Sequence, residues 1–401
     1  MNDFEKFVSE MESFERKIQF MDVLLGKAPF EQVLPEMNGD YVFGCGENGR
    51  PFSFQSIELP SLFIGVQKSG KTTGIANFIK TNYDKIKFII IESFKHDYRH
   101  LDRYLPNVRV FSYQLKTCRD NFLQAPPGLP DHEWNSIFAD IFTESLKLVI
   151  GAGVYHYFYN SISELKRMVH PRIPNMKDLY EYIRAKNEMR YSENHTFRER
   201  ILNRLAAILE DLSESIDCSE GFPIEQMQGQ DAVDIYELSN KTDTASLTFD
   251  LLIQKNLRYR MSLTPERRQK PVVFVIDEAK RMFGQHKISS RYTGSLDNLS
   301  NSMSISREYN VSYIISDQSI TSLHPNAPDF CGTFCLFQSN AETIHKMSNI
   351  MGLNQEQRRW LMDYGLEVGQ CVIKSGNWPP VMVRIPHFVY EKNVTDEEIR
   401  I

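Results

Sequence analysis

The segment GVQKSGKT, residues 65–72, has the residue types and the spacing of a phosphate-binding loop. It matches G-x-x-x-x-G-K-[ST], in which glycines let the backbone turn tightly and point several N–H groups at one anion. Lys71 is placed to reach the β- and γ-phosphates of a nucleoside triphosphate, and the Thr72 hydroxyl to ligate Mg²⁺. We therefore predict a site for ATP and Mg²⁺ whose phosphate-binding residues are Gly65, Lys68, Ser69, Gly70, Lys71, Thr72 and Thr73.

The flanks of this loop favour the prediction over a chance match. Residues 61–64 form a short apolar run typical of a buried strand, and apolar residues recur at helical spacing in 72–83. Strand, glycine loop and helix is the arrangement that the motif needs, because the N-terminus of the helix adds partial positive charge to the anion site.

A second run, VVFVIDE at residues 272–278, is typical of a buried parallel strand that ends in acid. Asp277 is placed to hold Mg²⁺, and Glu278 to orient and polarise the water that attacks the γ-phosphate. The alternative is an ordinary strand end with two solvated carboxylates. The phosphate-binding loop favours the catalytic interpretation.

A third strand-like run, VSYIISDQ at residues 311–318, also ends in polar residues. Gln318 is a candidate sensor of the γ-phosphate, with Asp317 as a competing candidate. Arg307, just upstream, suits stabilisation of a transferring phosphoryl group, in particular in an adjacent subunit. An arginine on the solvated end of a helix is the alternative, and the residues alone favour it.

Composition places the chain among ordinary globular proteins. Its 401 residues are 41% hydrophobic and 24% charged, with a net charge of −6. No apolar run approaches the ~20 residues that span a bilayer, and the acidic N-terminus does not resemble a signal peptide. The six scattered cysteines favour reduced thiols over zinc or disulfides. We therefore expect a cytoplasmic protein that does not contact a membrane. The net charge shows no basic face for nucleic acid, although a ring with a cationic pore would still fit.

In this order and spacing, GVQKSGKT, VVFVIDEAKRMFG and SREYNVSYIISDQS resemble the HerA/FtsK superfamily of RecA-like ring ATPases. The resemblance extends to Glu92 after the apolar run at 88–91, to NFLQAPPGLPDHEW (121–134), to AVDIYELSN (232–240) and to a closing hairpin at 369–386. It covers roughly residues 40 to 390.

The resemblance implies an α/β fold of the RecA-like P-loop NTPase type, with a mainly parallel central sheet. Carried over by position, it implies a catalytic set of Glu278, Arg307, Gln318 and Glu92, the last as an auxiliary acid. It implies Mg²⁺ ligation by Thr72 and Asp277. An arginine that acts on a neighbour's site also implies a homo-hexamer.

This chain departs from the family in two places. Only ~60 residues precede the loop, too few for the β-barrel with which HerA-type translocases begin. The acidic strand continues as DEAK rather than the frequent DEAH, with Lys280 beside the acids.

Two units are expected: residues 1–30 as an N-terminal helix and residues 31–401 as the ATPase domain with a helical insertion at about 130–225. Apolar residues of the first segment follow an a/d heptad pattern from Phe4 to Leu25. Docking to another subunit or partner and packing on its own ATPase domain both remain open. Basic and aromatic residues mix in the insertion, where surface Lys and Arg are a commoner explanation than strand binding.

The polar loop at residues 284–294 follows the acidic strand and contains His286, Lys287 and Arg291. In a ring these side chains would contact DNA phosphates in the pore without reading sequence. A surface loop without this role is the alternative.

Together these features predict Mg²⁺-dependent ATP hydrolysis in a hexameric HerA-like ring that drives DNA translocation or unwinding. Such a ring is expected to act with a nuclease or other effector in DNA processing or antiphage defence. One alternative is a secretion- or conjugation-type ATPase. Another is a nucleotide-gated scaffold that activates an effector with little translocation.

Overall fold

The structure, a computed structural model, describes residues 28–93, 95–145, 152–190, 192–221, 223–229, 231–280, 302–386, 388 and 390–399. Residues 1–27, which hold most of the predicted N-terminal helix, lie outside them. The same is true of residues 281–301, which hold His286, Lys287 and Arg291.

Apolar runs along the chain become the central strands, which are buried on both faces. In β3 (Ser61–Ile64), β4 (Lys87–Glu92) and β7 (Val272–Ile276), successive side chains enter opposite cores because the side-chain period of a strand is two. Leu62 and Ile64 join one core, for example, while Phe63 joins the other. A strand covered on both faces needs a continuous apolar run, and these segments supply one.

The described residues form one 11-stranded sheet with the order β2-β1-β11-β10-β9-β3-β8-β7-β4-β6-β5. All neighbours from β9 to β5 are parallel, whereas β10, β11, β1 and β2 extend the sheet antiparallel. The remaining strands are β1 (Tyr41–Gly46), β2 (Pro51–Phe54), β5 (Val108–Ser112), β6 (Val233–Glu237), β8 (Val311–Asp317), β9 (Thr333–Leu336), β10 (Gln370–Ser375) and β11 (Val381–Arg384). The predicted α/β class with a mainly parallel sheet is confirmed.

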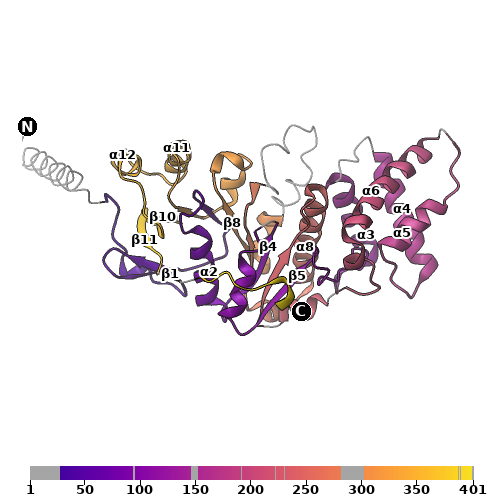
Figure 1. The fold of residues 1–401 in the computed structure, drawn as a ribbon, viewed down its shortest axis with the longest axis horizontal. Coiled ribbons are helices and arrows are strands. Elements are labelled where there is room, and N and C mark those ends of the chain that lie inside the picture. The colour runs from indigo at the N-terminus through magenta and orange to yellow at the C-terminus, as the bar shows by residue number, and fades with distance from the viewer. Residues whose placement is uncertain are drawn as a thin grey trace, which may run out of the picture.

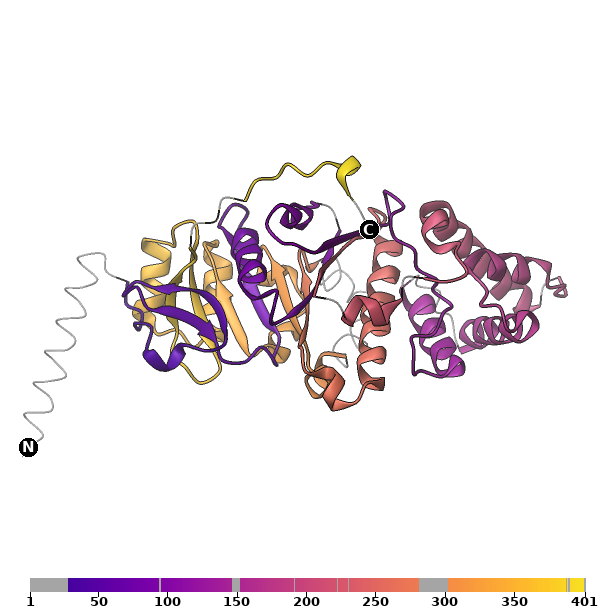
Figure 2. The same cartoon turned by 90° about the horizontal axis from the view of Figure 1, so that it is seen from below.

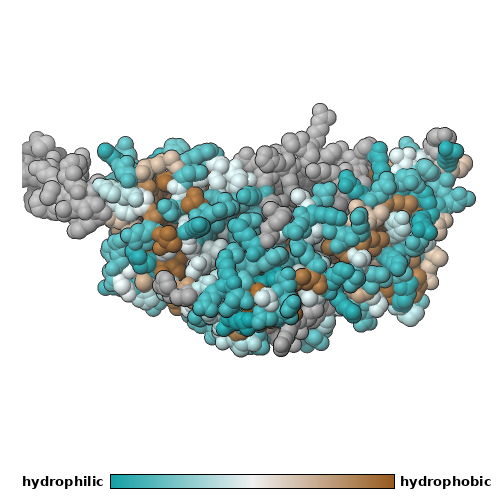
Figure 3. All heavy atoms as spheres, viewed as in Figure 1, coloured by the Kyte–Doolittle hydropathy of each residue, from teal (hydrophilic) through white to brown (hydrophobic). Residues whose placement is uncertain are grey.

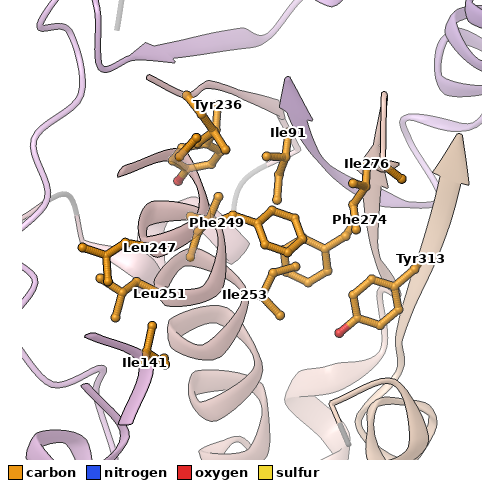
Figure 4. Packing of buried hydrophobic residues seen from close by; sticks show 14 of the residues in the cluster. Ile91, Ile141, Tyr236, Leu247, Phe249, Leu251, Ile253, Phe274, Ile276 and Tyr313 are labelled. Carbon is orange, nitrogen blue, oxygen red and sulfur yellow. The ribbon is translucent and has the colours of Figure 1, made fainter. Parts of the chain in front are cut away.

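Helices cover the two faces of the sheet (Figures 1 and 2). One face packs against α2 (Lys71–Asn82) and the 3₁₀ segment η2 (Tyr98–Arg103). The other packs against α8 (Thr242–Ser262), whose Phe249 and Ile253 lie close to Phe274 of β7 (Figure 4). The helices α11 (Ala341–Ile350) and α12 (Gln355–Asp363) follow β9 in the chain.

A helical region forms one end of the molecule, beyond α8 (Figure 1). It contains α3 (Asp131–Ser145), α4 (Ala152–Val169), α5 (Met176–Ala185) and α6 (Glu193–Ile216), followed by the short α7 (Ile224–Gly229). The helix α5 begins with a capping box in which Asn175 and Asp178 exchange side-chain and backbone hydrogen bonds. The helices from α3 to α6 lie within the helical insertion expected at about 130–225.

The other short 3₁₀ segments are η1 (Pro35–Met37), η3 (Pro265–Arg268), η5 (Arg307–Tyr309), η6 (Ile320–Ser322), η7 (Ala327–Phe330) and η8 (Asp396–Glu398). No helix within the described ranges is long and apolar enough to cross a membrane. The face seen in Figure 3 is largely hydrophilic, with smaller hydrophobic areas between the polar ones.

Candidate nucleotide site

Residues 65–70 form a tight loop between β3 and α2, at the edge where the parallel strands end. Gly70 precedes the helix with φ of 93°, a left-handed conformation that favours glycine. A Cβ on Gly65 would lie 2.6 Å from Phe337 Cβ, so the loop packs too closely there for a larger residue. Its backbone is held by Val66, whose N–H donates to Gln338 O at 2.8 Å. The loop backbone is thus held in place before any ligand binds.

The loop offers polar groups that suit an anion. Ser69 is fully buried, and its Oγ has no hydrogen-bond partner among the described residues. Lys71 is only 8% exposed, and burial lowers the pKa of its ammonium, an effect that Asp277 and Asp317 partly oppose. A buried cation and an unpaired hydroxyl both gain from a bound phosphate, because each is otherwise inadequately solvated. The residues present therefore fit a nucleoside triphosphate.

Asp277, after β7, is the carboxylate that fits Mg²⁺. Ser316 Oγ donates to its Oδ1 at 2.8 Å, and the Glu278 N–H donates to the same oxygen at 3.0 Å. Burial raises the pKa of Asp277, while Lys71 and the hydrogen bond from Ser316 oppose that rise. Carboxylate oxygens are the ligands that Mg²⁺ prefers, and Lys71 and Ser316 favour the ionised form of Asp277.

Glu278 follows directly with φ of 53°, which is unusual for a residue with a side chain. Its Oε1 lies 2.5 Å from Lys95 Nζ. Although burial opposes it, the hydrogen bond with Glu278 raises the pKa of Lys95. The predicted catalytic acid is therefore linked to a lysine at the end of the neighbouring strand, β4.

Glu92, the predicted auxiliary acid, anchors the backbone after β4. Its oxygens accept hydrogen bonds from the N–H groups of Asp97, at 2.8 Å, and Tyr98, at 3.2 Å. Burial and the nearby Glu237 raise the pKa of Glu92 well above its ordinary value. Its contacts are those of a residue that positions the loop carrying Lys95.

A buried ion pair lies beside this loop. Arg99 donates to both carboxylate oxygens of Glu237, each at 2.6 Å. Although burial would raise it, the nearby His96 and the hydrogen bonds from Arg99 lower the pKa of Glu237 to about 2. Arg99 also pairs with Asp396, so the C-terminal segment is fastened here (Figure 2).

The phosphate-binding loop, the start of α2 and the segment after β4 line a pocket of about 350 Å³. Its walls include Lys68, Thr72, Thr73, Lys95, Gln318 and Lys392. Lys392 belongs to the C-terminal segment, and its Nζ lies 2.5 Å from Asp97 Oδ1. Lysines thus reach the pocket from three separate parts of the chain.

Gln318 and Asp317, the two candidate sensors, differ in their surroundings. Gln318 lines the pocket. Asp317 is buried, and its carboxylate accepts hydrogen bonds from the N–H groups of Lys280 and Gln318, both at 2.6 Å, and from Ser322 Oγ at 2.9 Å. These contacts tie the end of β8 to the acidic strand, and Gln318 remains the predicted sensor.

Arg307 lies away from this site. It precedes β8, and Asp317 ends that strand, so about 20 Å of extended chain separates Arg307 from the edge that holds the loop. Its side chain is 60% exposed and pairs with Glu58 at 3.1 Å. Within one subunit Arg307 does not meet the other predicted site residues.

Sequence reasoning missed several residues of this site: Lys95, Asp97, Arg99, Glu237 and Lys392. The first three lie in KHDYR, directly after the strand that ends in Glu92, and their polarity at a strand end was a usable signal. Lys392 comes from a distant part of the chain, and no local pattern marks it.

Comparison with known proteins shows the fold. VirB4 of Thermoanaerobacter pseudethanolicus superposes with a TM-score of 0.66 at 15% identity, covering 90% of this chain and 99% of that chain. The plasmid coupling protein TrwB, in complex with ADP and Mg²⁺, gives 0.64 at 12% identity, with coverage of 92% and 98%. At such identities the likeness shows the fold alone: a RecA-like P-loop NTPase fold. No family model and no curated protein matches the sequence.

Proposed function

We propose that this chain is a Mg²⁺-dependent ATPase. The proposal rests on one observation: the buried Lys71 and the unpaired Ser69 hydroxyl stand on a tight loop, and Lys71 interacts electrostatically with Asp277 and Glu278. The loop after β3 and the acids after β7 lie at the same edge of the parallel sheet, which brings phosphate-binding and metal-binding groups together. The fold shared with TrwB, whose structure holds ADP and Mg²⁺, supports it.

Each residue has a role in this proposal. Lys71, Ser69 and the loop N–H groups hold the phosphates, while Thr72 and Asp277 hold Mg²⁺. Bound Mg²⁺ would neutralise charge on the phosphate oxygens. Glu278 orients the attacking water, and Gln318 contacts the terminal phosphate.

Substitution of Lys71 tests the ATPase directly. We expect Lys71→Ala to reduce ATP hydrolysis by at least about 100-fold, because the loop then lacks its cation. Lys346→Ala, on the exposed face of α11, is the matched control and should hydrolyse ATP at the normal rate. Equal rates for wild type and Lys71→Ala would refute the proposal.

We further propose that the active form is a hexameric ring in which Arg307 completes the site of a neighbouring subunit. Its distance from its own loop and its exposure support this arrangement. A lone subunit should then bind ATP yet hydrolyse it poorly. Mixing Arg307→Ala with Glu278→Gln subunits should restore activity, since some interfaces carry both intact groups. Each variant alone should stay inactive, and an inactive mixture would contradict the role of Arg307 between subunits.

The work driven by hydrolysis is proposed to be DNA translocation or unwinding with a nuclease or other effector. Duplex DNA should then stimulate turnover, and joint replacement of His286, Lys287 and Arg291 by alanine should abolish the stimulation. The second candidate is a secretion- or conjugation-type ATPase, which the likeness to VirB4 and to the coupling protein TrwB favours. Turnover indifferent to DNA but raised by a protein partner would favour that candidate or a nucleotide-gated scaffold.

A further inference from the structure

The contact between Lys95 and Glu278 joins the pocket to the proposed catalytic acid. Lys95 lines the pocket, and its side chain is 42% exposed. Glu278 is 14% exposed, and its Oε1 lies 2.5 Å from the lysine ammonium. A charge that faces the pocket is therefore in direct contact with the group expected to activate water.

Hydrogen bonds fix the backbone near both partners. The N–H of Glu278 donates to Asp277 Oδ1, and its φ of 53° sets the direction in which the side chain leaves. In the segment that carries Lys95, the carboxylate of Glu92 accepts hydrogen bonds from the N–H groups of Asp97 and Tyr98. The side chains are thus the adjustable part of this contact.

The lysine is the partner better suited to move. Its ammonium is a compact charge on a flexible four-carbon stem, whereas the glutamate has a shorter reach. The terminal phosphate of ATP carries more negative charge than one carboxylate. Since Lys95 already lines the pocket with Thr72 and Gln318, a bound triphosphate competes with Glu278 for it.

We propose that Lys95 senses the terminal phosphate: without nucleotide it pairs with the Glu278 carboxylate, and bound ATP draws it from Glu278 to the phosphate, so that Glu278 can orient the attacking water. This inference rests on the proposed ATPase function. Lys95 is thereby a positioning residue for Glu278 as well as a ligand of the terminal phosphate. ADP lacks that phosphate and leaves the Lys95–Glu278 contact in place.

Binding measurements on a cycle of variants test the proposal. The ligands are a non-hydrolysable ATP analogue and ADP, each with Mg²⁺, titrated by calorimetry against wild type, Lys95→Met, Glu278→Gln and the double variant. We expect Lys95→Met to weaken the analogue about tenfold, the effect of one charge-assisted hydrogen bond, and to change ADP binding by less than about twofold.

The Glu278→Gln variant supplies the sharper readout. Its amide competes less for Lys95, so the analogue should bind about tenfold more tightly than to wild type. A competing explanation is that Glu278 repels the phosphate directly. In that case Glu278→Gln should tighten binding of the analogue equally in the Lys95→Met background. Our proposal predicts that Glu278→Gln loses the gain in the Lys95→Met background. Lys95→Arg, which keeps the charge, should keep the preference for the analogue over ADP.

Two results would overturn the proposal: equal weakening of ADP and analogue by Lys95→Met, or the same gain from Glu278→Gln in both backgrounds. ADP binding reports in each variant whether the site is folded, and Lys95→Gln replaces Lys95→Met if the latter does not fold. Failure of the wild type to bind or hydrolyse ATP would instead refute the ATPase proposal, so the two failures are distinguishable.

Discussion

The strands β4 and β6 carry charged residues at both of their ends, and the two ends differ. Where these strands begin, Lys87 pairs with Asp234 at 2.9 Å and donates to Ala232 O at 2.6 Å, while Arg109 pairs with the same Asp234 at 2.6 Å. We call Lys87, Asp234 and Arg109 the N-edge cluster. Lys87 and Asp234 are almost completely buried, and each is paired with an opposite charge of the same chain.

At the opposite edge of the sheet, where β4, β6, β7 and β8 end, carboxylates outnumber cations among the described residues. This C-edge cluster consists of Glu92, Glu237, Asp277, Glu278 and Asp317 with Lys71, Lys95 and Arg99. In the N-edge cluster the one carboxylate is paired with two cations of the same chain, whereas a surplus of carboxylates beside a cationic loop is suited to a metal ion and phosphates. The difference separates structural charges from those proposed to act on a ligand.

Glu278→Gln should give the largest effect at the C-edge cluster. We expect kcat to fall by 10²–10⁴-fold, because the attacking water loses its base. The free energy of unfolding should change by less than about 0.5 kcal/mol, since the side chain is partly exposed and the shape is kept. Steady-state ATPase assays and urea denaturation measure the two quantities. Glu342→Gln on α11 is the control for kcat. Loss of stability with retained turnover would reverse the role that we assign to this edge.

Lys87→Met should give the opposite pattern at the N-edge cluster. It leaves Asp234 with Arg109 alone, and breaking a buried ion pair costs about 3 kcal/mol of unfolding free energy. Turnover per folded molecule should stay unchanged. Lys85→Met is the matched control, because that lysine is exposed and its ammonium donates only to Asp40 O among the described residues. A loss below about 1 kcal/mol would show that hydrophobic packing replaces the ion pair.

The sequence predicted the parts of the C-edge cluster that are local in the chain. The loop at residues 65–72 and the acids Asp277 and Glu278 each follow a buried strand, so pattern and context both lie within about 15 residues. The seven-residue β8 was likewise predictable from its apolar run.

The pairings between distant segments were not predictable in this way. Lys95 contacts Glu278 only because β4 and β7 are adjacent in the sheet, and the sequence of a single strand does not determine the order of the strands. The segment around Glu237 was part of the resemblance, yet nothing in that segment shows that its carboxylate pairs with Arg99 on another element. Lys392 reaches the pocket because the C-terminal segment crosses η2.

Ser316→Ala should have a smaller effect, which is specific to the metal. It removes the hydrogen bond to Asp277 Oδ1 and with it one of the influences that oppose the raised pKa of Asp277. Protons then compete better with Mg²⁺, and we expect about tenfold more Mg²⁺ at half-maximal turnover. Ser322→Ala is the matched control, because Ser322 Oγ donates at a similar distance to Asp317. Equal Mg²⁺ dependence of the two variants would exclude Asp277 as the metal-site acid.

The smallest predicted effect is a pH dependence of stability at the N-edge cluster. Burial, opposed by Asp234, lowers the pKa of Lys87 from 10.5 to about 8. Between these values the unfolded chain binds more protons than the folded chain, so the free energy of unfolding rises with pH. The rise from this one group is about 1 kcal/mol between pH 8 and 9.

Urea denaturation of wild type and Lys87→Met at pH 8 and pH 9 isolates this contribution, because both proteins share every other titrating group. The wild type should gain stability relative to the variant as the pH rises. An unchanged difference between wild type and variant would mean that Asp234 keeps the proton on Lys87 in the folded chain. The attraction within the cluster would then offset the burial of the ammonium, and the N-edge cluster would stabilise the fold more strongly than its lowered lysine pKa indicates.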